Sequence, residues 1–234
     1  MRTPEISIII PCYNEEKNIF NTIKSISNHF KKAQFEIIVI DDGSIDSTRK
    51  IISSIDNIII NEKRDNKGKG FSIKEGVLKS KGKKILITDA DLSTPINEFQ
   101  KLDKFINQFE IVIGSRGLKG SQVQNNVFRI LFGKIGNFLI RFIVRNISDT
   151  QCGFKLLNAN IAKEIFSLIT IDGFGYDFEL LFLAQKKKYN IKEIPIKWKS
   201  SIDSRVVPLD YFYTLMELIK VISNELNNKY SGNT

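Results

Sequence analysis

Two hydrophobic patterns alternate along the first half of the chain. Short continuous runs of apolar, mostly β-branched residues are typical of buried strands, whereas apolar residues spaced three or four positions apart are typical of helices that bury one face. The runs predict strands at residues 6–10, 35–40, 58–60, 84–88 and 110–113, with Pro11 ending the first. Helical spacing lies between them, at residues 15–30, after a capping Asp46, and at residues 71–78 and 99–106. Apolar strands separated by helices predict an α/β fold with a mostly parallel central sheet flanked by helices.

The second half has a different pattern. A long helical pattern covers residues 126–145, and a short element follows at residues 153–157. Two helices, a strand and a closing helix are predicted at residues 161–168, 178–187, 191–196 and 209–226. We expect a single domain over residues 1–226 and a flexible polar tail over residues 227–234.

Composition narrows the class of protein. The chain has 234 residues, of which 42% are hydrophobic, so it can bury a core and is neither disordered nor collagen-like. It carries 35 Lys and Arg against 26 Asp and Glu, a formal charge of +9. This charge favours an anionic partner, which could be nucleic acid, a phosphorylated substrate or an acidic membrane.

Few residues are available for histidine or thiol chemistry. His29 is the only histidine, and Cys12 and Cys152 lack the spacing of metal ligands. We therefore expect reduced thiols in a cytoplasmic protein. Neither a signal-peptide pattern nor a run of 18 uncharged apolar residues is present, so we expect a protein that is soluble or attached to a membrane surface.

Polar clusters follow three of the predicted strands, at residues 11–15, at residues 41–44 and at Asp89 and Asp91. Residues two apart in an extended chain point to the same side, so the last two carboxylates can face one ligand. A hard cation such as Mg²⁺ would relieve their repulsion. The alternative is a capped turn before Pro95, which is common where a strand leads into a helix. Three acidic strand ends in register favour the metal site.

Two basic segments could contact phosphate. Residues 66–70 read Asn-Lys-Gly-Lys-Gly before a predicted helix, so backbone N–H groups and Lys69 could bind the phosphates of a nucleotide. The alternative is a solvated basic turn. Arg116 follows the fifth strand, and its guanidinium suits bidentate phosphate contact, the alternative being a surface arginine.

Four motifs follow one another in the first half: Tyr-Asn-Glu at 13–15, Asp-Asp-Gly-Ser at 41–44, Asp-Ala-Asp at 89–91 and Gly-Ser-Arg at 114–116. In this order they resemble the family-2 glycosyltransferases of the GT-A fold, which is Rossmann-like. Three later segments, at residues 149–155, 176–181 and 204–206, are similar to the polyprenyl (dolichyl) phosphate hexosyltransferases, above all to the dolichyl-phosphate β-glucosyltransferase branch.

The resemblance implies a nucleotide-sugar half over residues 5–120 and an acceptor and membrane-facing half over residues 121–226. The positions implied to line the nucleoside pocket are Pro11, Tyr13, Glu15, Asp41 and Asp42. Those implied to bind the divalent metal, Mg²⁺ or Mn²⁺, are Asp89 and Asp91, while Arg116 and Arg205 would contact phosphate oxygens. Those implied on the sugar and acceptor side are Asp149, Gln151, Lys155, Asp177 and Glu179. Ser93 departs from the bulkier residue of many mannosyl relatives, so water would replace a third protein ligand.

The reaction implied is an inverting transfer of a hexose, from UDP-glucose, to a polyprenyl phosphate. A phosphate with a second pKa of about 6 is largely dianionic at neutral pH, so it can attack without a general base and form a β-linked product from an α-linked donor. The alternatives are a GDP-mannose-dependent enzyme, a nucleotidyltransferase and a nucleic-acid-binding module. A nucleotidyltransferase normally has a glycine-rich loop after the first strand, and this chain does not. The acidic strand ends speak against nucleic acid.

A polyprenyl acceptor requires contact with a membrane. Residues 126–145 predict an interfacial helix with basic residues beside one apolar face. That face consists of Phe128, Leu131, Phe132, Ile135, Phe138, Leu139, Phe142 and Ile143. The alternative is a helix packed on the core or in a dimer. We expect attachment to the cytoplasmic face of a membrane, and the sequence leaves open an integral membrane partner or a homo-oligomer.

Overall fold

A seven-stranded sheet forms the centre of the protein in the computed structural model, which describes residues 3–56, 58–62, 65–124, 139–199 and 208–230. Its strands, in spatial order, are β3 (Ile59–Glu62), β2 (Phe35–Asp41), β1 (Ile6–Cys12), β4 (Lys84–Ile87), β7 (Lys155–Asn158), β5 (Ile111–Ser115) and β8 (Ile191–Pro195). All neighbours pair in parallel except β7, which is antiparallel to both β4 and β5. The prediction of a mostly parallel sheet is confirmed.

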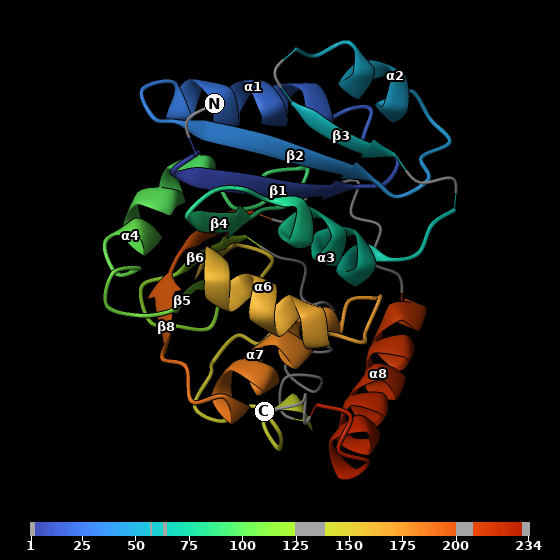
Figure 1. The fold of residues 1–234 in the computed structure, drawn as a ribbon, viewed down its shortest axis with the longest axis vertical. Coiled ribbons are helices and arrows are strands. Elements are labelled where there is room, and N and C mark those ends of the chain that lie inside the picture. The colour runs from blue at the N-terminus through green and yellow to red at the C-terminus, as the bar shows by residue number, and fades with distance from the viewer. Residues whose placement is uncertain (1–2, 57, 63–64, 125–138, 200–207, 231–234) are drawn as a thin grey trace.

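Helices cover both faces of the sheet (Figure 1). The helices and the short 3₁₀ turn are α1 (Ile19–Phe30), α2 (Thr48–Ser53), α3 (Lys69–Lys79), η1 (Ile96–Glu98), α4 (Phe99–Asp103), α6 (Ala159–Leu168), α7 (Tyr176–Lys186) and α8 (Pro208–Leu226). One core lies between the sheet and α3, α6 and α7, and the other lies between the sheet and α1, α2 and α4. Because both faces are buried, the strands are apolar throughout rather than alternating.

The first strand continues beyond the predicted end at Pro11. In a parallel ladder, residues two apart direct their backbone groups to the same neighbour. The carbonyl of Ile9 accepts a hydrogen bond from Thr88 on the β4 side, at 3.1 Å. Pro11, which has no N–H, therefore also faces the β4 side, where pairing has already ended at Ile87. The strand can thus pair with β2 as far as Cys12.

The helix predicted at residues 126–145 lies mostly outside the described residues. From residue 139 onwards the chain forms hydrogen-bonded turns, and Ile140 and Val144 are buried in the core. Leu139 and Ile143 of the predicted membrane-facing side also pack against this core, whereas Phe142 is exposed. This end of the segment is therefore anchored to the protein. No helix in the described ranges is both long and apolar enough to cross a bilayer.

The prediction of a flexible tail from residue 227 is wrong for its first residues. Tyr230 is buried, and its hydroxyl donates a hydrogen bond of 2.6 Å to Glu179 of α7. The same hydroxyl accepts a hydrogen bond of 3.4 Å from the buried amide of Asn224. The chain is thus attached to the domain as far as residue 230.

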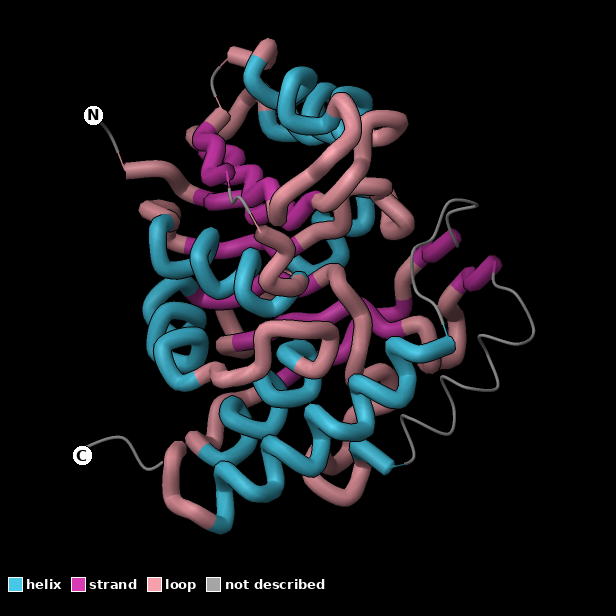
Figure 2. The backbone as a smooth tube through the Cα atoms, turned by 90° about the vertical axis from the view of Figure 1, so that its right-hand side faces the viewer, coloured by secondary structure: helices cyan, strands magenta, loops and turns pink. Residues whose placement is uncertain are grey.

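A second, two-stranded ladder joins β6 (Gln122–Gln124) in parallel to β9 (Lys197–Lys199). Figure 2 shows this ladder apart from the main sheet. Trp198 of β9 packs against the core beneath α1 and α4 and also reaches Arg116, which follows β5. The ladder therefore borders the edge of the sheet at which the polar strand ends meet.

Candidate functional site

The candidate site lies at the carboxyl edge of the sheet. The chain order reverses between β1 and β4, because β2 and β3 lie on the other side of β1. Ligands of open α/β sheets bind at such a switch point. The antiparallel β7 begins at this same edge with Lys155, so it brings residues 149–155 beside the ends of β4 and β5.

Asp89 and Asp91 follow β4 in a tight turn. Leu92 has a positive φ of 46°, and Asp91 accepts hydrogen bonds from the backbone N–H of Ser93 at 2.9 Å and from its hydroxyl at 2.7 Å. The capped turn and the carboxylate pair are thus features of the same segment. Gly153 leaves room for Asp89, because a Cβ at this glycine would lie 2.6 Å from Oδ2 of Asp89.

Lys69, the first residue of α3, pairs with this carboxylate. Its Nζ lies 2.6 Å from Oδ1 of Asp89. Burial raises the pKa of Asp89, but the nearby Lys69, Lys155 and Arg116 outweigh it and hold that pKa below its usual range. Burial and the negative charge of Asp89 raise the pKa of Asp91. In the described part of the chain, Asp91 forms no ion pair with a basic side chain, so the site has one uncompensated carboxylate.

Arg116 is held by Asp149. Its Nε donates to Oδ2 at 2.7 Å and its Nη2 donates to Oδ1 at 2.8 Å, and Nη2 also reaches the carbonyl of Gln151 at 3.0 Å. The guanidinium lies over the ring of Trp198, 5.3 Å from its centroid. Burial raises the pKa of Asp149, but the pairing with Arg116 has the larger and opposite effect, so this pKa lies below its usual range. Arg116 is therefore oriented by the protein before any ligand binds.

Lys155 and Asp177 form a second ion pair, which is buried. The Lys155 ammonium contacts the Asp177 carboxylate and the carbonyl of Cys152, and it lies over the ring of Tyr176. Lys155 is fully buried and Asp177 nearly so. This pair connects the start of β7 to the first turn of α7, close to Asp89.

The loops after β1 and β2 hold each other. Asn14, at a positive φ of 54°, accepts hydrogen bonds from Ile45 and Asp46, and its own N–H donates to Ser44 at 2.8 Å. A short polar side chain can adopt this left-handed conformation and bond the backbone at little cost. Pro11 is buried beside these loops, while Tyr13 and Glu15 are half-buried there.

The carboxylates of the Asp-Asp motif are bonded within the protein. Asp41 is fully buried, and Arg49 lies 3.1 Å from its Oδ2. Asp42 accepts hydrogen bonds from the N–H groups of Lys67 at 3.0 Å and Gly68 at 2.8 Å. The N–H groups that we expected to approach a phosphate thus bind the carboxylate of Asp42. The prediction that Asp41 and Asp42 contact a nucleoside remains a prediction.

Glu179 lies on the other side of α7 from Asp177, because two residues turn a helix by about 200°. Its carboxylate is fully buried and accepts hydrogen bonds from Thr170, Ile171 and Tyr230. The structure therefore gives Glu179 a role in holding the loop before α7 and the C-terminal segment. The prediction that Glu179 lies on the sugar and acceptor side remains a prediction.

Arg205 lies outside the described residues. Gln151 takes part in the site through its backbone, since its carbonyl accepts from Arg116 and its N–H reaches Asp149 at 3.3 Å. Asn14, Gly153 and Trp198 were not among the predicted site residues. Asn14 and Gly153 belong to motif segments, which was the signal that could have identified them.

The residues present fit a divalent cation with few protein ligands. The two carboxylates at Asp89 and Asp91 are hard oxygen donors, and the uncompensated charge at Asp91 favours a cation. Gly153 keeps the side of Asp89 that carries Oδ2 free of a side chain. No group of three or more His, Cys, Asp or Glu side chains that could enclose a metal occurs among the residues the structure describes. Such a site would leave coordination positions for water and phosphate oxygens.

Solved structures share this fold. The chain matches glucosyl-3-phosphoglycerate synthase from Mycobacterium tuberculosis, solved with Mn²⁺, UDP and phosphoglyceric acid, with a TM-score of 0.71 at 18% identity over 94% of this chain and 77% of that chain. It matches mannosyl-3-phosphoglycerate synthase from Rubrobacter xylanophilus with a TM-score of 0.71 at 14% identity over 99% and 76% of the two chains. The fold, with its carboxylate pair after β4, is therefore that of the GT-A glycosyltransferases.

Sequence comparison defines the family. Residues 7–166 match Glycosyl transferase family 2. The chain is 35% identical over 229 residues to dolichyl-phosphate beta-glucosyltransferase of Homo sapiens, covering 88% of this chain and 71% of that protein. It is 34% identical over 239 residues to the protein of the same name from Dictyostelium discoideum, covering 93% and 72%. The chain belongs to glycosyltransferase family 2, which confirms the predicted fold, family and enzyme class.

Proposed function

We propose that this enzyme transfers glucose from UDP-glucose to a polyprenyl phosphate of the dolichyl type. The observation that carries the proposal is the carboxylate pair of Asp89 and Asp91, surrounded by Lys69, Lys155 and Arg116 at the switch point of the sheet. Such a site suits a diphosphate that arrives with a divalent cation. The similarity to dolichyl-phosphate beta-glucosyltransferases supports glucose as the sugar and a lipid phosphate as the acceptor.

The residues near the site suit an acceptor that needs no general base. His29 lies at the end of α1, where its ring packs against Phe30 and Phe99, and burial lowers its pKa. A phosphate is already largely dianionic at neutral pH, since its second pKa is about 6. One of its oxygens would attack the anomeric carbon while the bond from that carbon to UDP breaks, and the bonding electrons would leave with UDP. A single displacement of this kind inverts an α-linked donor into a β-linked product.

The protein's own groups would position both phosphates. A divalent cation, Mg²⁺ or Mn²⁺, would be held by Asp89 and Asp91 and would neutralise the diphosphate of the leaving group. Arg116 is oriented by Asp149 and keeps hydrogen-bonding capacity for a phosphate oxygen, because a guanidinium has five N–H donors. Lys155, whose charge is matched by Asp177, adds positive potential near Asp89 without being exposed to water.

A radiolabel transfer assay tests the proposal. Purified protein is incubated with polyprenyl phosphate, Mg²⁺ or Mn²⁺, and labelled UDP-glucose, UDP-galactose or GDP-mannose in turn. We expect label to enter the lipid fraction from UDP-glucose, with the β configuration, and to be lost in Asp91→Ala. Transfer from GDP-mannose alone would identify the mannosyl alternative. Full activity of a folded Asp91→Ala, or an α-linked product, would contradict the proposed site or mechanism.

The acceptor requires contact with a membrane surface, and α8 would make this contact. Its outward side bears large apolar side chains, and the charged Glu217 and the amide Asn224 lie on other sides of the helix. At about 100° per residue these apolar side chains fall on one side of the helix. They are Phe212, Leu215, Met216, Ile219, Ile222 and Leu226, of which Ile219 is 53% and Leu226 77% exposed. We call them the α8 apolar stripe.

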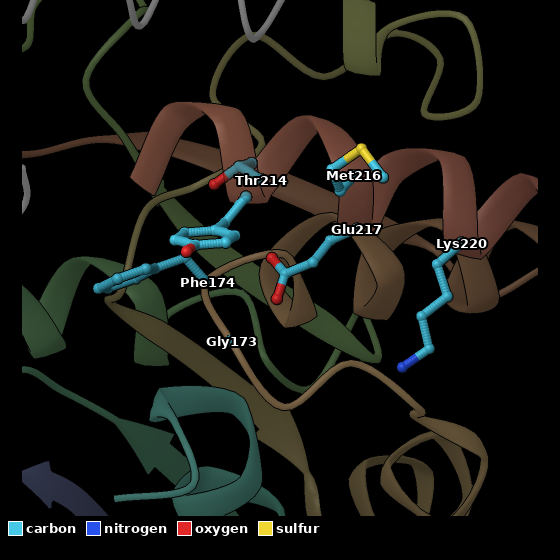
Figure 3. Close-up of a pocket in the computed structure, with 7 residues that line it drawn as sticks. Gly173, Phe174, Thr214, Met216, Glu217 and Lys220 are labelled. Atoms are coloured by element: carbon cyan, nitrogen blue, oxygen red, sulfur yellow. The ribbon is translucent and has the colours of Figure 1, made fainter. Parts of the chain in front are cut away.

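An anionic bilayer is the partner that fits this stripe. The exposed Lys229 lies just after the C-terminal end of α8, where it can contact lipid headgroups. A cavity of about 530 Å³ opens beside the stripe, between α8 and the loop of Gly173 and Phe174. Figure 3 shows Glu217 reaching from α8 to this loop, where it accepts a hydrogen bond from Gly175 at 2.8 Å. This loop leads into α7, whose first turn contains Asp177 of the candidate site. The contact of Glu217 with the loop therefore links α8, which carries the stripe, to the candidate site.

Liposome flotation tests this placement. We expect the protein to float with anionic vesicles that contain no acceptor lipid, and Ile219→Asp to weaken binding about tenfold or more, because a charge in the interface is costly. Phe20→Asp is the matched control, since Phe20 is 50% exposed on α1, far from the stripe. Unchanged flotation of Ile219→Asp would contradict the proposal. A dimer in light scattering that Ile219→Asp dissociates would instead indicate that a second copy covers the stripe.

The two free thiols support a location on the cytoplasmic side of the membrane. Cys12 and Cys152 are both buried and unpaired, and burial raises the pKa of each, to about 12 for Cys152. Reduced cysteines are typical of proteins in the cytoplasm. Protease accessibility in sealed microsomes would test this side, because a protein on the cytoplasmic face is digested without detergent.

A further inference from the structure

We infer that Lys69 is a built-in counter-ion of the carboxylate pair, which occupies Asp89 until a divalent cation arrives and then contacts the diphosphate that the cation brings. The inference rests on the proposed function for the nature of the diphosphate. Its first part concerns only the protein and the cation, and it can be tested without any sugar or acceptor.

The backbone around Lys69 is held in place from two sides. The N–H groups of Lys67 and Gly68 are bound by Asp42 at the end of β2. Gly68 has a φ of 109°, which favours glycine, and a Cβ there would collide with the carbonyl of Asp172. A Cβ at Gly70 would lie 2.6 Å from the carbonyl of Ile171 and 2.7 Å from Cβ of Tyr176. The start of α3 is therefore clamped between β2 and the loop before α7.

This clamp directs the ammonium of Lys69 to Asp89. The distance from Nζ to Oδ1 is 2.6 Å, and the side chains are only 21% and 27% exposed. The ammonium is therefore a resident cation rather than a mobile surface charge.

The other charges at the site explain why a divalent cation can displace Lys69 from Asp89. Lys155 is matched by Asp177 and Arg116 by Asp149, so within the described ranges Lys69 is the cation left to compensate the carboxylate pair. Among these residues one unmatched positive charge therefore faces two carboxylates, and Asp91 makes its hydrogen bonds to Ser93 instead of to Lys69. A divalent cation matches both carboxylates, so it competes with Lys69 for Asp89. The four-carbon stem of the displaced lysine is flexible, and its three donors suit a phosphate oxygen.

Three consequences distinguish this role from a simple structural ion pair. Without Lys69, two carboxylates face each other unpaired, so the metal-free protein loses stability. The same change removes a competitor, so the cation alone binds more tightly. It also removes a ligand of the diphosphate, so UDP binds less tightly once the cation is present. A lysine that only holds α3 to β4 would change stability without tightening metal binding.

Lys69→Met and the control Lys79→Met provide the test, since Lys79 lies on the same helix and forms a more exposed pair with Glu75 at 3.6 Å. Mn²⁺ alone is titrated against each protein, with free Mn²⁺ followed by electron paramagnetic resonance. UDP is then titrated at saturating Mn²⁺, and melting is recorded in chelator and in Mn²⁺. For Lys69→Met we expect Mn²⁺ alone to bind about tenfold tighter and UDP about tenfold weaker, the range of one charge-assisted hydrogen bond. We also expect a lower melting temperature in chelator, which Mn²⁺ restores.

Unchanged or weaker binding of Mn²⁺ to Lys69→Met would overturn the inference, as would unchanged binding of UDP. Lys69→Gln, which keeps a donor but no charge, should move all three quantities in the same direction by smaller amounts if Lys69→Met fails to fold. The result is separable from the proposed function. If the Mn²⁺ response holds and no sugar is transferred to polyprenyl phosphate, the counter-ion role stands and the proposed substrates are wrong.

Discussion

Arg116 and Asp149 form a two-point ion pair at the carboxyl edge of the sheet, with Nε to Oδ2 at 2.7 Å and Nη2 to Oδ1 at 2.8 Å. The backbone N–H of Arg116 donates to the same carboxylate at 2.9 Å, so the side chain is fixed relative to the end of β5. Asp149 is in turn held by Glu193 of β8, which accepts from its N–H at 3.0 Å. The arginine that we propose to contact phosphate is thus oriented by residues from two other segments of the chain.

Replacing Asp149 with asparagine should separate orientation from charge. Asp149→Asn keeps the Arg116 side chain but gives it a neutral partner with one oxygen acceptor in place of two, and we expect it to lower the free energy of unfolding by about 2–3 kcal/mol, the range for hydrogen bonds between charged groups. Transfer to polyprenyl phosphate should fall because the guanidinium is no longer fixed. Urea denaturation and the transfer assay measure the two effects. A variant as stable and as active as the parent would show that the pair orients nothing.

The same pair predicts a pH dependence of stability. The pKa of Asp149 is lowered in the folded protein, so its contribution is present above its unfolded pKa of about 3.9 and is lost as the pH falls through the folded value. The difference in unfolding free energy between the parent and Asp149→Asn should therefore be constant near neutral pH and shrink below about pH 4. Urea denaturation of both proteins at a series of pH values measures it. A difference that grows on acidification would contradict the assigned direction.

The buried pair of Lys155 and Asp177 should respond differently to single and double replacement. Lys155→Met leaves the Asp177 carboxylate buried without a cation, and we expect a loss of about 3–5 kcal/mol in unfolding free energy. Adding Asp177→Leu removes the stranded charge and should recover part of this loss. A double-mutant cycle from urea denaturation measures the coupling. Strictly additive effects would indicate that the two charges do not depend on each other.

The fold of the first half could be predicted because each of its elements is encoded locally. The strand at residues 35–41 contains an apolar run at residues 37–40, and α1 shows its buried face in the spacing of Ile19, Ile23 and Ile26. The order of the strands in the sheet, in contrast, is not encoded by any short segment of the sequence. The short element at residues 153–157 was recognised, but its insertion as β7 between β4 and β5 depends on contacts with strands more than 40 residues away in sequence. The burial of Tyr230 likewise depends on a distant partner, Glu179.

The part of the candidate site that lies directly after the strands could be predicted from the sequence. Asp89 and Asp91 lie where a parallel sheet places its ligands, and Lys69 is beside them. Motif membership does not tell whether a carboxylate faces a ligand or the protein. Asp42 accepts hydrogen bonds from the N–H groups of Lys67 and Gly68, and Glu179 accepts hydrogen bonds from the loop before α7 and from Tyr230. The motifs themselves do not indicate these partners.

Gly153 should control the position of Asp89. In Gly153→Ala the new Cβ would lie 2.6 and 2.7 Å from the carboxylate oxygens of Asp89, so the flexible side chain must move aside. We expect the free energy of unfolding to change by no more than about 1 kcal/mol. The transfer rate should fall about 10- to 100-fold, the effect of displacing a site group by about 1 Å. Gly117→Ala is the control, since its nearest contact, the carbonyl of Ser148, is at 3.2 Å. Equal rates for the two variants would rule out this role of Gly153.

The C-terminal anchor gives a last prediction, with a control of the same chemistry in a different environment. The Tyr230 hydroxyl donates to Glu179 at 2.6 Å in the core, while the Tyr189 hydroxyl donates to Glu164 at 2.7 Å at the surface. Glu179 keeps its bonds to the loop before α7 when Tyr230 is changed, so Tyr230→Phe removes one charge-assisted bond. We expect Tyr230→Phe to lower the free energy of unfolding by about 1.5–3 kcal/mol and Tyr189→Phe by less than about 1 kcal/mol, because water replaces the exposed donor. Urea denaturation measures both. Equal losses for the two variants would mean that burial does not strengthen the hydrogen bond that anchors Tyr230.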